Sequence, residues 1–340
     1  MIKIGDIAKA TGFSVTTVSK ALNNYTDISD TTKALIIKKA NELGYIPNLQ
    51  ARGLVMKRSF TFGVMLDEIL DLGLEHPFFA GVIQSFREAI EDQGYDLVFI
   101  SNAIGNSPIE SYLAHCRQKS VDGVFILCTN PKDEGVLQLI ESEVPTVVFD
   151  YSLKNSHCLL SNHYQGSYEA VEYLLNLGHS KIGHIYGSEL TYAGAERRRA
   201  YIEALKHNKI ALRDDYMVSG GYFDFKYGKK AMKELLSLED RPSAVFVAGD
   251  IMALGAIQCC YEENIRIPED LSIIGFDNVR LLDWITPALT SVSQNVKEIG
   301  KQCCELLIEN VKNKEMAFET RIVNTSIVER KSCAPYMKKK

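Results

Sequence analysis

From Thr61 onward the sequence alternates between short apolar runs and longer amphipathic stretches. The apolar runs have the length and composition of buried strands, and the amphipathic stretches carry the helical period. Continuous apolar strands separated by helices are typical of parallel sheets covered on both faces. The runs fall into two series, so we predict an α/β body of two doubly wound, parallel-sheet lobes with a cleft between them.

Each series supplies the expected elements of one lobe. The first has expected strands at 62–66, 97–100, 124–127 and 146–149, and expected helices at 79–93, 109–119 and 134–141. The second has expected strands at 181–186, 244–248 and 271–276, and expected helices at 164–177, 195–208, 227–236 and 252–264. A chain of 340 residues is long for a single core, which agrees with more than one domain.

Residues 4–23 carry the pattern of two short helices joined by a tight turn. Gly12 suits the left-handed conformation that ends a helix, and Ser14 can accept a hydrogen bond from the free amides that open the next one. This is a helix-turn-helix arrangement, whose second helix can lie in a DNA major groove. The side chains that this helix would present to base edges are Val15, Thr16, Thr17, Ser19 and Lys20.

A third helix completes an all-α head. Ser29 is its expected N-cap and Gly44 its expected C-cap. On the second helix, Val18 and Leu22 follow Val15 on one apolar stripe. The apolar residues expected to close the small core of the head are Leu35, Ile36, Ala40 and Leu43. Pro47 stops further helix, and residues 48–56 form a helical fragment too short to be stable alone. That fragment is either a plain linker or a segment that folds on binding.

Charge separates the head from the rest of the chain. Residues 1–58 hold nine Lys/Arg and four Asp/Glu, a net charge of +5, whereas the remainder carries −10. Two short amphipathic helices also occur in proteins that bind no DNA. A basic head on an acidic body, however, is expected of a polyanion-binding module on a soluble scaffold, and so favours DNA binding.

Three stretches of the head carry a family resemblance. V-T-T-V-S-K-A-L-N at 15–23, the run 29–43 and G-Y-I-P-N-L-Q-A-R-G-L at 44–54 resemble the head and hinge of the LacI/GalR family of bacterial repressors. The likeness continues through the body, which in that family has the architecture of periplasmic sugar-binding proteins. The C-terminal part is closest to the purine-responsive branch. The resemblance implies a ligand-responsive repressor that binds a pseudo-palindromic operator.

The same resemblance assigns a role to the short segment after Pro47. In the family, matching segments from two subunits pair as hinge helices in the minor groove, and a leucine at the position of Leu54 wedges between base steps. Asn23 and Arg52 are further expected DNA contacts. Gly53 stands where the family more often has serine. Because glycine disfavours helix by about 1 kcal/mol relative to alanine, we expect hinge folding to depend more on DNA here.

An effector site is also implied by the resemblance, residue by residue. H-P-F-F at 76–79 matches the family's N-P-F-F, A-E-R-R-R-A-Y at 195–201 resembles R-x-R-x-x-G-[YFW], and A-G-D-I-M-A-L-G-A at 248–256 matches closely. The expected effector contacts are Phe78, Phe79, Tyr151, Arg197, Phe223 and Asp250, with Tyr222 as the alternative to Phe223.

Arg197 and Asp250 are the central pair of this prediction. The planar guanidinium can hold two oxygens of a ligand. An aspartate at a helix N-terminus is expected to stay ionised and to accept from hydroxyl or ring N–H groups. The alternatives are a structural salt bridge or helix cap for this pair, and core packing for Phe78 and Phe79.

Two departures from the family bear on the effector. Ser161-Asn162 stands where the family commonly has Asp-Asn, which removes a carboxylate. The other pocket arginine and threonine of the purine-responsive branch fall on Thr191 and Ala193. We therefore expect a sugar or sugar-like effector, with a purine-type, corepressor-dependent repressor as the alternative.

The sequence contains none of four common motifs of catalysis and cofactor binding: a G-x-G-x-x-G after a strand, a P-loop, H-E-x-x-H and G-x-S-x-G. The seven histidines have no metal-ligand spacing, so we expect no enzyme activity, cofactor or metal. The eight cysteines form no C-x-x-C, and neither a signal peptide nor a membrane-spanning run is visible. Buried, reduced thiols and a cytoplasmic location follow.

The expected domains are a head at 1–46, a hinge at 47–58 and a body at 59–335. The N-lobe would comprise about 59–161 and 293–322, and the C-lobe about 162–292 and 323–335. No heptad pattern follows residue 332, so we expect a homodimer, with the helices that start near Phe79 and Asp250 at its interface. The competing class is a solute-binding protein with no DNA role, which the body alone would allow.

Overall fold

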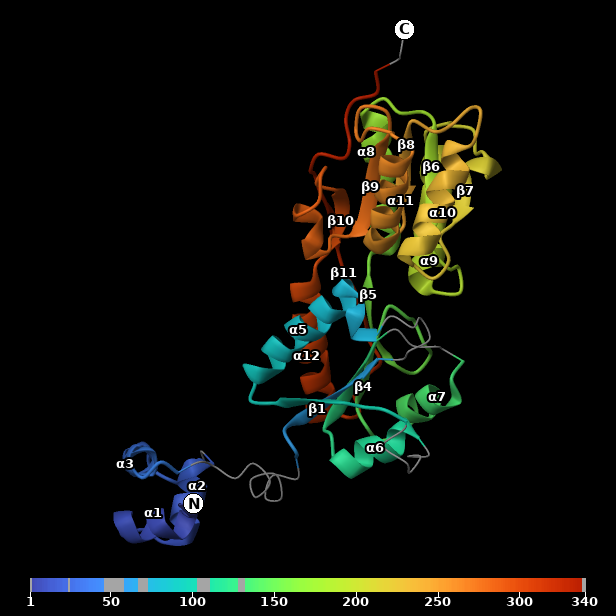
Figure 1. Cartoon of the computed structure of the whole chain (residues 1–340). Helices are drawn as coiled ribbons and strands as arrows, with labels where there is room; N and C mark the ends of the chain where they lie inside the picture. Colours follow the sequence, from blue (N-terminus) through green and yellow to red (C-terminus); the bar gives the residue numbers. More distant parts are fainter. Residues whose placement is uncertain are drawn as a thin grey trace. The chain divides into compact units, whose positions relative to one another are not determined.

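The computed structural model describes residues 2–23, 25–45, 58–66, 73–102, 111–127 and 132–337. The chain divides into two compact units, Met1–Phe60 and Thr61–Lys340 (Figure 1). Arg52, Gly53 and Leu54, and with them most of the expected hinge, lie outside the described residues.

The first unit contains α1 (Ile4–Thr11), α2 (Val15–Leu22) and α3 (Asp30–Glu42). Gly12 ends α1 with a φ of 75°, and its amide donates to the Ala8 carbonyl. The Ser14 hydroxyl accepts from the Thr17 amide at 3.0 Å, and Ser29 caps α3 in the same way. The caps predicted at Gly12, Ser14 and Ser29 are confirmed. The C-cap of α3 is Leu43, one residue before the predicted Gly44, whose φ is 68°.

The core of this unit corrects one prediction. Leu35 is 51% exposed, although it was expected in the core. At 3.6 residues per turn, Leu35 lies about a third of a turn from the centre of the buried face of α3. Val15, which the sequence placed among the side chains facing DNA, is 55% exposed. The residues that do close this core are Ile7, Ala8, Val18, Ala21, Ile36 and Ala40.

The N-lobe is built on a six-stranded sheet of order β11-β5-β4-β3-β1-β2, in which every pair is parallel. Its strands are β1 (Thr61–Leu66), β2 (Asp96–Phe99), β3 (Gly123–Leu127), β4 (Thr146–Phe149), β5 (His157–Ser161) and β11 (Thr320–Val323). Its helical elements are η2 (Gly73–Glu75), α5 (Pro77–Glu91), α6 (Tyr112–Lys119), α7 (Glu134–Ile140) and α12 (Val296–Lys312).

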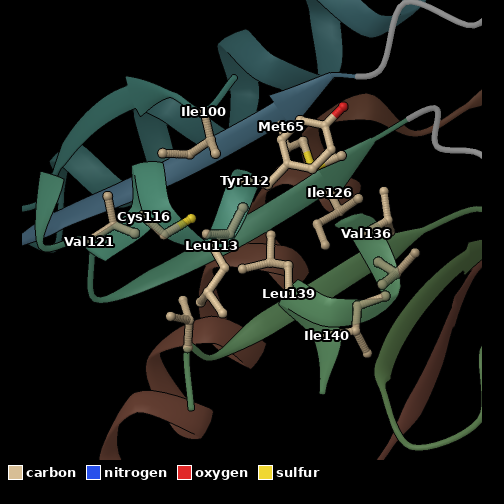
Figure 2. Close-up of a cluster of buried hydrophobic side chains, with 13 residues drawn as sticks. Met65, Ile100, Tyr112, Leu113, Cys116, Val121, Ile126, Val136, Leu139 and Ile140 are labelled. Carbon is tan, nitrogen blue, oxygen red and sulfur yellow. The ribbon is translucent and has the colours of Figure 1, made fainter. Parts of the chain in front are cut away.

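Side chains alternate between the two faces of this sheet. Val124 and Ile126 of β3 join the cluster under α6 and α7 that Figure 2 shows, with Leu113 and Leu139. Phe125 points the other way, its ring 5.0 Å from that of Phe86 on α5. Helices α5 and α12 pack together (Figure 1), so both faces of the sheet are covered, as the continuous apolar strands predicted.

The C-lobe repeats this plan with a sheet of order β12-β10-β9-β8-β6-β7. Its strands are β6 (Ile182–Tyr186), β7 (Met217–Ser219), β8 (Ala244–Val247), β9 (Ser272–Asp277), β10 (Thr290–Gln294) and β12 (Thr325–Val328). Its helical elements are α8 (His163–Asn176), α9 (Tyr192–His207), η3 (Asp214–Tyr216), α10 (Phe225–Leu236), α11 (Asp250–Glu262) and η4 (Arg280–Asp283). The pairs are parallel except for the edge strand β12, which runs antiparallel to β10. The predicted fold class is confirmed.

Three connections join the two sheets (Figure 1). Asn162 follows β5 and precedes α8, Asn295 links β10 to α12, and Asn324 links β11 to β12. The side chains of Asn162 and Asn324 hydrogen bond to each other at 3.2 Å. Residues beside these connections are therefore the ones that can respond to a change in the arrangement of the lobes.

Candidate functional site

The side chains of α2 that were predicted to face DNA bases differ in their exposure and in their partners within the protein. Val15 and Thr16 are exposed, whereas Thr17, Ser19 and Lys20 are half-buried. Lys20 forms an ion pair with Asp27. An exposed pair of this kind contributes little to stability, so Lys20 remains able to turn to another anion. Asn23 donates to the Ser19 carbonyl at 2.9 Å, which ends the helix.

Arg197 is the centre of the candidate effector site. It lies on α9 and is 3% exposed. Its Nη1 donates to the Ala248 carbonyl at 2.5 Å, its Nε faces His163 Nδ1 at 3.3 Å, and its Nη2 lies 3.3 Å from Asp277 Oδ1. Burial lowers the pKa of Arg197, while Asp277 opposes that shift most strongly. The guanidinium fork that was expected to hold a ligand is mostly engaged within the protein.

Asp277 and Gln294 extend this network across two strand ends. Asp277 closes β9 with a φ of 113°, a conformation that costs free energy in a residue with a side chain. Its Oδ1 accepts from Gln294 Nε2 at 2.7 Å as well as from Arg197. Among the described residues, Gln294 Oε1 is buried without a hydrogen-bond partner. The carboxylate of Asp277, a residue with a strained backbone, and the unpaired Oε1 of Gln294 therefore lie close together beside Arg197.

The N-lobe reaches the same network through Asp150. This residue follows β4 with a φ of 53°, and its Oδ1 accepts from the Ser161 amide at 2.9 Å. The same oxygen lies 2.9 Å from His163 Nε2. His163 belongs to α8, so this contact joins a carboxylate of one lobe to Arg197 in the other.

Phe223 supplies an aromatic face to the site. Its ring lies 5.6 Å from the guanidinium carbon of Arg197, whose other aromatic neighbour, Phe276, is at 3.8 Å. A Cβ at Gly187 would lie 2.2 Å from the Phe223 ring, so the ring rests directly on backbone there. Tyr222, the alternative from the sequence, is 43% exposed. The geometry therefore favours Phe223 over Tyr222 as the aromatic residue of the candidate site.

The prediction for Asp250 is wrong in one respect. The sequence predicted an ionised carboxylate open to a ligand, but the side chain has no exposed surface. Its Oδ2 accepts from the Val279 amide at 2.9 Å and its Oδ1 from the Ser291 hydroxyl at 2.8 Å. Burial, and then Asp277, raise the pKa of Asp250 well above its usual value. Asp250 therefore supports the loop after Asp277 from beneath.

The aromatic residues expected on the N-lobe divide between core and site. Phe78 is 5% exposed and packs on Phe149, with ring centroids 6.1 Å apart. Tyr151 packs against the core beneath α6 and α7. Phe79 is half-buried, and its ring lies 5.2 Å from that of His76.

His76 interacts electrostatically with Asp277 and Arg197 of the C-lobe. Burial lowers its pKa, while Asp277 raises it and Arg197 lowers it further. The side chain is 6% exposed, and its Nδ1 lacks a hydrogen-bond partner within the described residues. Of the four residues in H-P-F-F, His76 and Phe79 thus have the geometry of site residues.

Sequence reasoning assigned no role to Asp150, Asp277, Gln294, His163 or His76. A positional signal was available, because Asp150, Asp277 and Gln294 each stand at or just after a strand end. The carboxyl ends of parallel strands are where α/β proteins bind ligands. No cluster of His, Cys, Asp and Glu suited to a metal ion occurs in the part of the chain that the structure describes.

Comparison with known proteins decides the family. Residues 3–48 match the model of bacterial regulatory proteins of the lacI family, and residues 171–333 match that of a periplasmic binding protein-like domain. The HTH-type transcriptional repressor PurR of Edwardsiella ictaluri (strain 93-146) is 35% identical over 339 residues, covering 98% of this chain and 97% of that one. The chain belongs to the LacI family of bacterial regulatory proteins. It is a ligand-responsive, DNA-binding transcriptional regulator, and the solute-binding alternative is not favoured.

Solved structures agree with this assignment. A transcriptional regulator CelR–cellobiose complex superposes with a TM-score of 0.71 at 26% identity, covering 98% of this chain and 100% of that one. A LacI family regulator from Enterococcus faecium with bound ribose gives a TM-score of 0.70 at 26% identity, covering 82% of this chain and all of that one. The lac repressor dimer bound to operator shares the fold, with a TM-score of 0.78 at 23% identity over 98% of this chain and 99% of that one. None of the described helices is long and apolar enough to cross a membrane.

The raised pKa of Asp250 can be tested through the pH dependence of the unfolding free energy. A carboxyl group whose pKa is raised on folding binds its proton more tightly in the folded state, so stability falls as pH rises above about 4. We expect Asp250→Asn to lower the unfolding free energy more at pH 5 than at pH 8, measured by urea denaturation.

Asp240→Asn is the matched control. The pKa of the exposed Asp240 is lowered, first by Lys181 and then by Arg213, so the stability it contributes is lost as pH falls. Because that loss occurs below about pH 4, its replacement should cost about the same at pH 5 as at pH 8. An Asp250→Asn variant with the same pH trend as this control would contradict a raised pKa at Asp250.

Proposed function

We propose that this regulator is a cytoplasmic, homodimeric repressor whose affinity for a pseudo-palindromic operator is set by a sugar-like molecule at the junction of its lobes. The observation that carries the proposal is the convergence of Arg197, Asp277 and Phe223 of one lobe with His76 of the other. Two buried polar atoms there, His76 Nδ1 and Gln294 Oε1, lack partners among the described residues. Buried polar atoms of this kind favour a ligand that completes their hydrogen bonds.

The groups at the junction suit a hydroxylated, uncharged ring. Phe223 offers an apolar face, and Asp277 and Gln294 offer acceptors for hydroxyl groups. Asp277 pairs with the guanidinium of Arg197, and Asp150 acts on the same guanidinium electrostatically, so two carboxylates already offset its charge. A sugar phosphate would add a further negative charge, so a neutral effector is favoured. The cellobiose and ribose bound by the two structures at 26% identity agree with this class.

A purine is the second candidate. The relatives named PurR in Edwardsiella ictaluri and Proteus mirabilis (strain HI4320), 35% and 34% identical over 339 residues, favour it. The position of Thr191 opposes it, because the Thr191 hydroxyl caps α9 by accepting from the Gly194 amide and donates to the Ser188 carbonyl. That side chain has no free group with which to hold a base.

The head would read the operator through Val15, Thr16 and Lys20, with the hinge at 47–58 folding on DNA and Leu54 entering the minor groove. Helices α5 and α11 begin beside His76 and Asp250, so a change at the junction moves elements that we also place at the dimer interface. Effector affinity would then differ between two interface arrangements, of which one lets the hinges fold. The protein would act by binding alone, without catalysis.

Replacing the site residues tests the effector role. We expect Arg197→Lys and Phe223→Ala to weaken effector binding by about tenfold or more, because each removes a contact to a buried group. Binding would be measured by calorimetry with cellobiose, ribose, hypoxanthine and guanine. DNA binding in the absence of effector should stay unchanged.

Arg199→Lys is the control for the arginine, since Arg199 is exposed and paired with Glu196 on the same helix. Wild-type binding of hypoxanthine or guanine but of neither sugar would select the second candidate. Unchanged affinity in both site variants would remove Arg197 and Phe223 from the site.

Leu54→Ala tests the hinge. Loss of a minor-groove wedge should weaken specific operator binding by about tenfold or more, since the bent DNA is no longer stabilised, and leave salt-driven, non-specific binding nearly unchanged. Fluorescence anisotropy with operator and scrambled DNA at several salt concentrations measures both. Leu190→Ala, at a leucine that is 78% exposed, is the control. Equal loss on the two DNAs would exclude the wedge.

A further inference from the structure

His163 occupies the first position of α8, immediately after the connection at Asn162. Its side chain is 1% exposed. The rings of Tyr192 and Phe276 lie 5.9 Å and 5.8 Å from it and leave it little room to turn. A histidine held in this way has a fixed orientation, so its two ring nitrogens have separate roles.

The partners of the two nitrogens fix the tautomer. Nδ1 lies 3.3 Å from Arg197 Nε and 3.2 Å from Arg197 Nη2. A guanidinium has no acceptor, so Nδ1 must accept. The proton of the neutral ring is then on Nε2. Nε2 lies 2.9 Å from Asp150 Oδ1, a close polar contact without hydrogen-bond geometry.

The contacts of His163 run from one lobe to the other. Asp150 is anchored in the N-lobe, where its Oδ1 also accepts from the Ser161 amide. Arg197 is anchored in the C-lobe by Ala248 and Asp277. The histidine thus links a carboxylate beside one sheet to the guanidinium beside the other, and any shift of the lobes alters these contacts.

We propose that His163 is a positioning residue of the effector site: it sets the orientation of Arg197 and couples that orientation to the N-lobe through Asp150. This inference rests on the function proposed above for the same site. Effector affinity then depends on His163, although the imidazole acts only through Arg197. A change in the arrangement of the lobes alters the orientation of the guanidinium through the neutral ring of His163.

Two variants separate the two contacts. Asparagine places an amide near the position of Nδ1 and can accept from Arg197, but it does not reach Asp150. Glutamine places its amide near the position of Nε2 and can reach Asp150, but it loses the acceptor for Arg197. Each removes one of the two polar contacts of His163, that with Asp150 or that with the buried Arg197, so we expect each to weaken effector binding by about tenfold.

The binding experiment uses the full chain and four probes, cellobiose, ribose, hypoxanthine and guanine, by calorimetry. His207→Asn, at an exposed histidine on α9, is the control and should bind as the wild type does. Thermal unfolding confirms that each variant is folded. Affinities of both His163 variants within twofold of the wild type, for a probe that the wild type binds, would overturn the inference.

A second arm needs no probe. Nitrogen-15 spectra of the histidine rings in the full chain should show His163 with a protonated Nε2 and an unprotonated Nδ1, and Asp150→Asn should shift the Nε2 signal. A proton on Nδ1, or no response to Asp150→Asn, would overturn the relay. Should the wild type bind none of the four probes, the proposed effector class is wrong, and the spectra still decide the role of His163.

Discussion

The buried guanidinium of Arg197 constrains the whole body of this regulator. A cation taken out of water is costly unless the protein supplies its hydrogen bonds and a compensating charge. Here the Ala248 carbonyl, His163 and Asp277 supply the hydrogen bonds, and the Phe276 ring covers one face at 3.8 Å. Three separate segments of the C-lobe must therefore meet at one point, and that point lies at the end of the lobe where the chain passes between the sheets.

Other features of the site follow from this cation. Asp277 is held at a φ of 113° while its Oδ1 serves both Arg197 and Gln294. The loop behind Asp277 is fastened by Asp250, whose buried carboxyl accepts from the Val279 amide and the Ser291 hydroxyl. A strained backbone conformation persists only where several hydrogen bonds hold it in place, and such conformations are common at functional sites. A ligand that offers hydroxyl groups here can exchange hydrogen bonds with the network without exposing the charge to water.

What the sequence could predict was local or periodic. The caps at Gly12, Ser14 and Ser29 depend on neighbours within a few residues, and the α/β lobes follow from apolar runs. The strand β10 was missed because Thr290 and Ser291 read as polar. Both are buried, with Thr290 bonded to Ser332 and Arg330 far along the chain. Asp250 was misassigned for the same reason: its position in a motif was visible, but the amide and hydroxyl that occupy its oxygens come from another part of the chain.

The central claim is that a polar chain from Asp150 through His163 to Arg197 couples the lobes. A double-mutant cycle with Asp150→Asn and Arg197→Lys, measured as unfolding free energy in urea, tests it most directly. We predict a coupling of about 1 kcal/mol or more, falling markedly in a His163→Ala background. Additivity within about 0.5 kcal/mol with His163 in place would contradict the account.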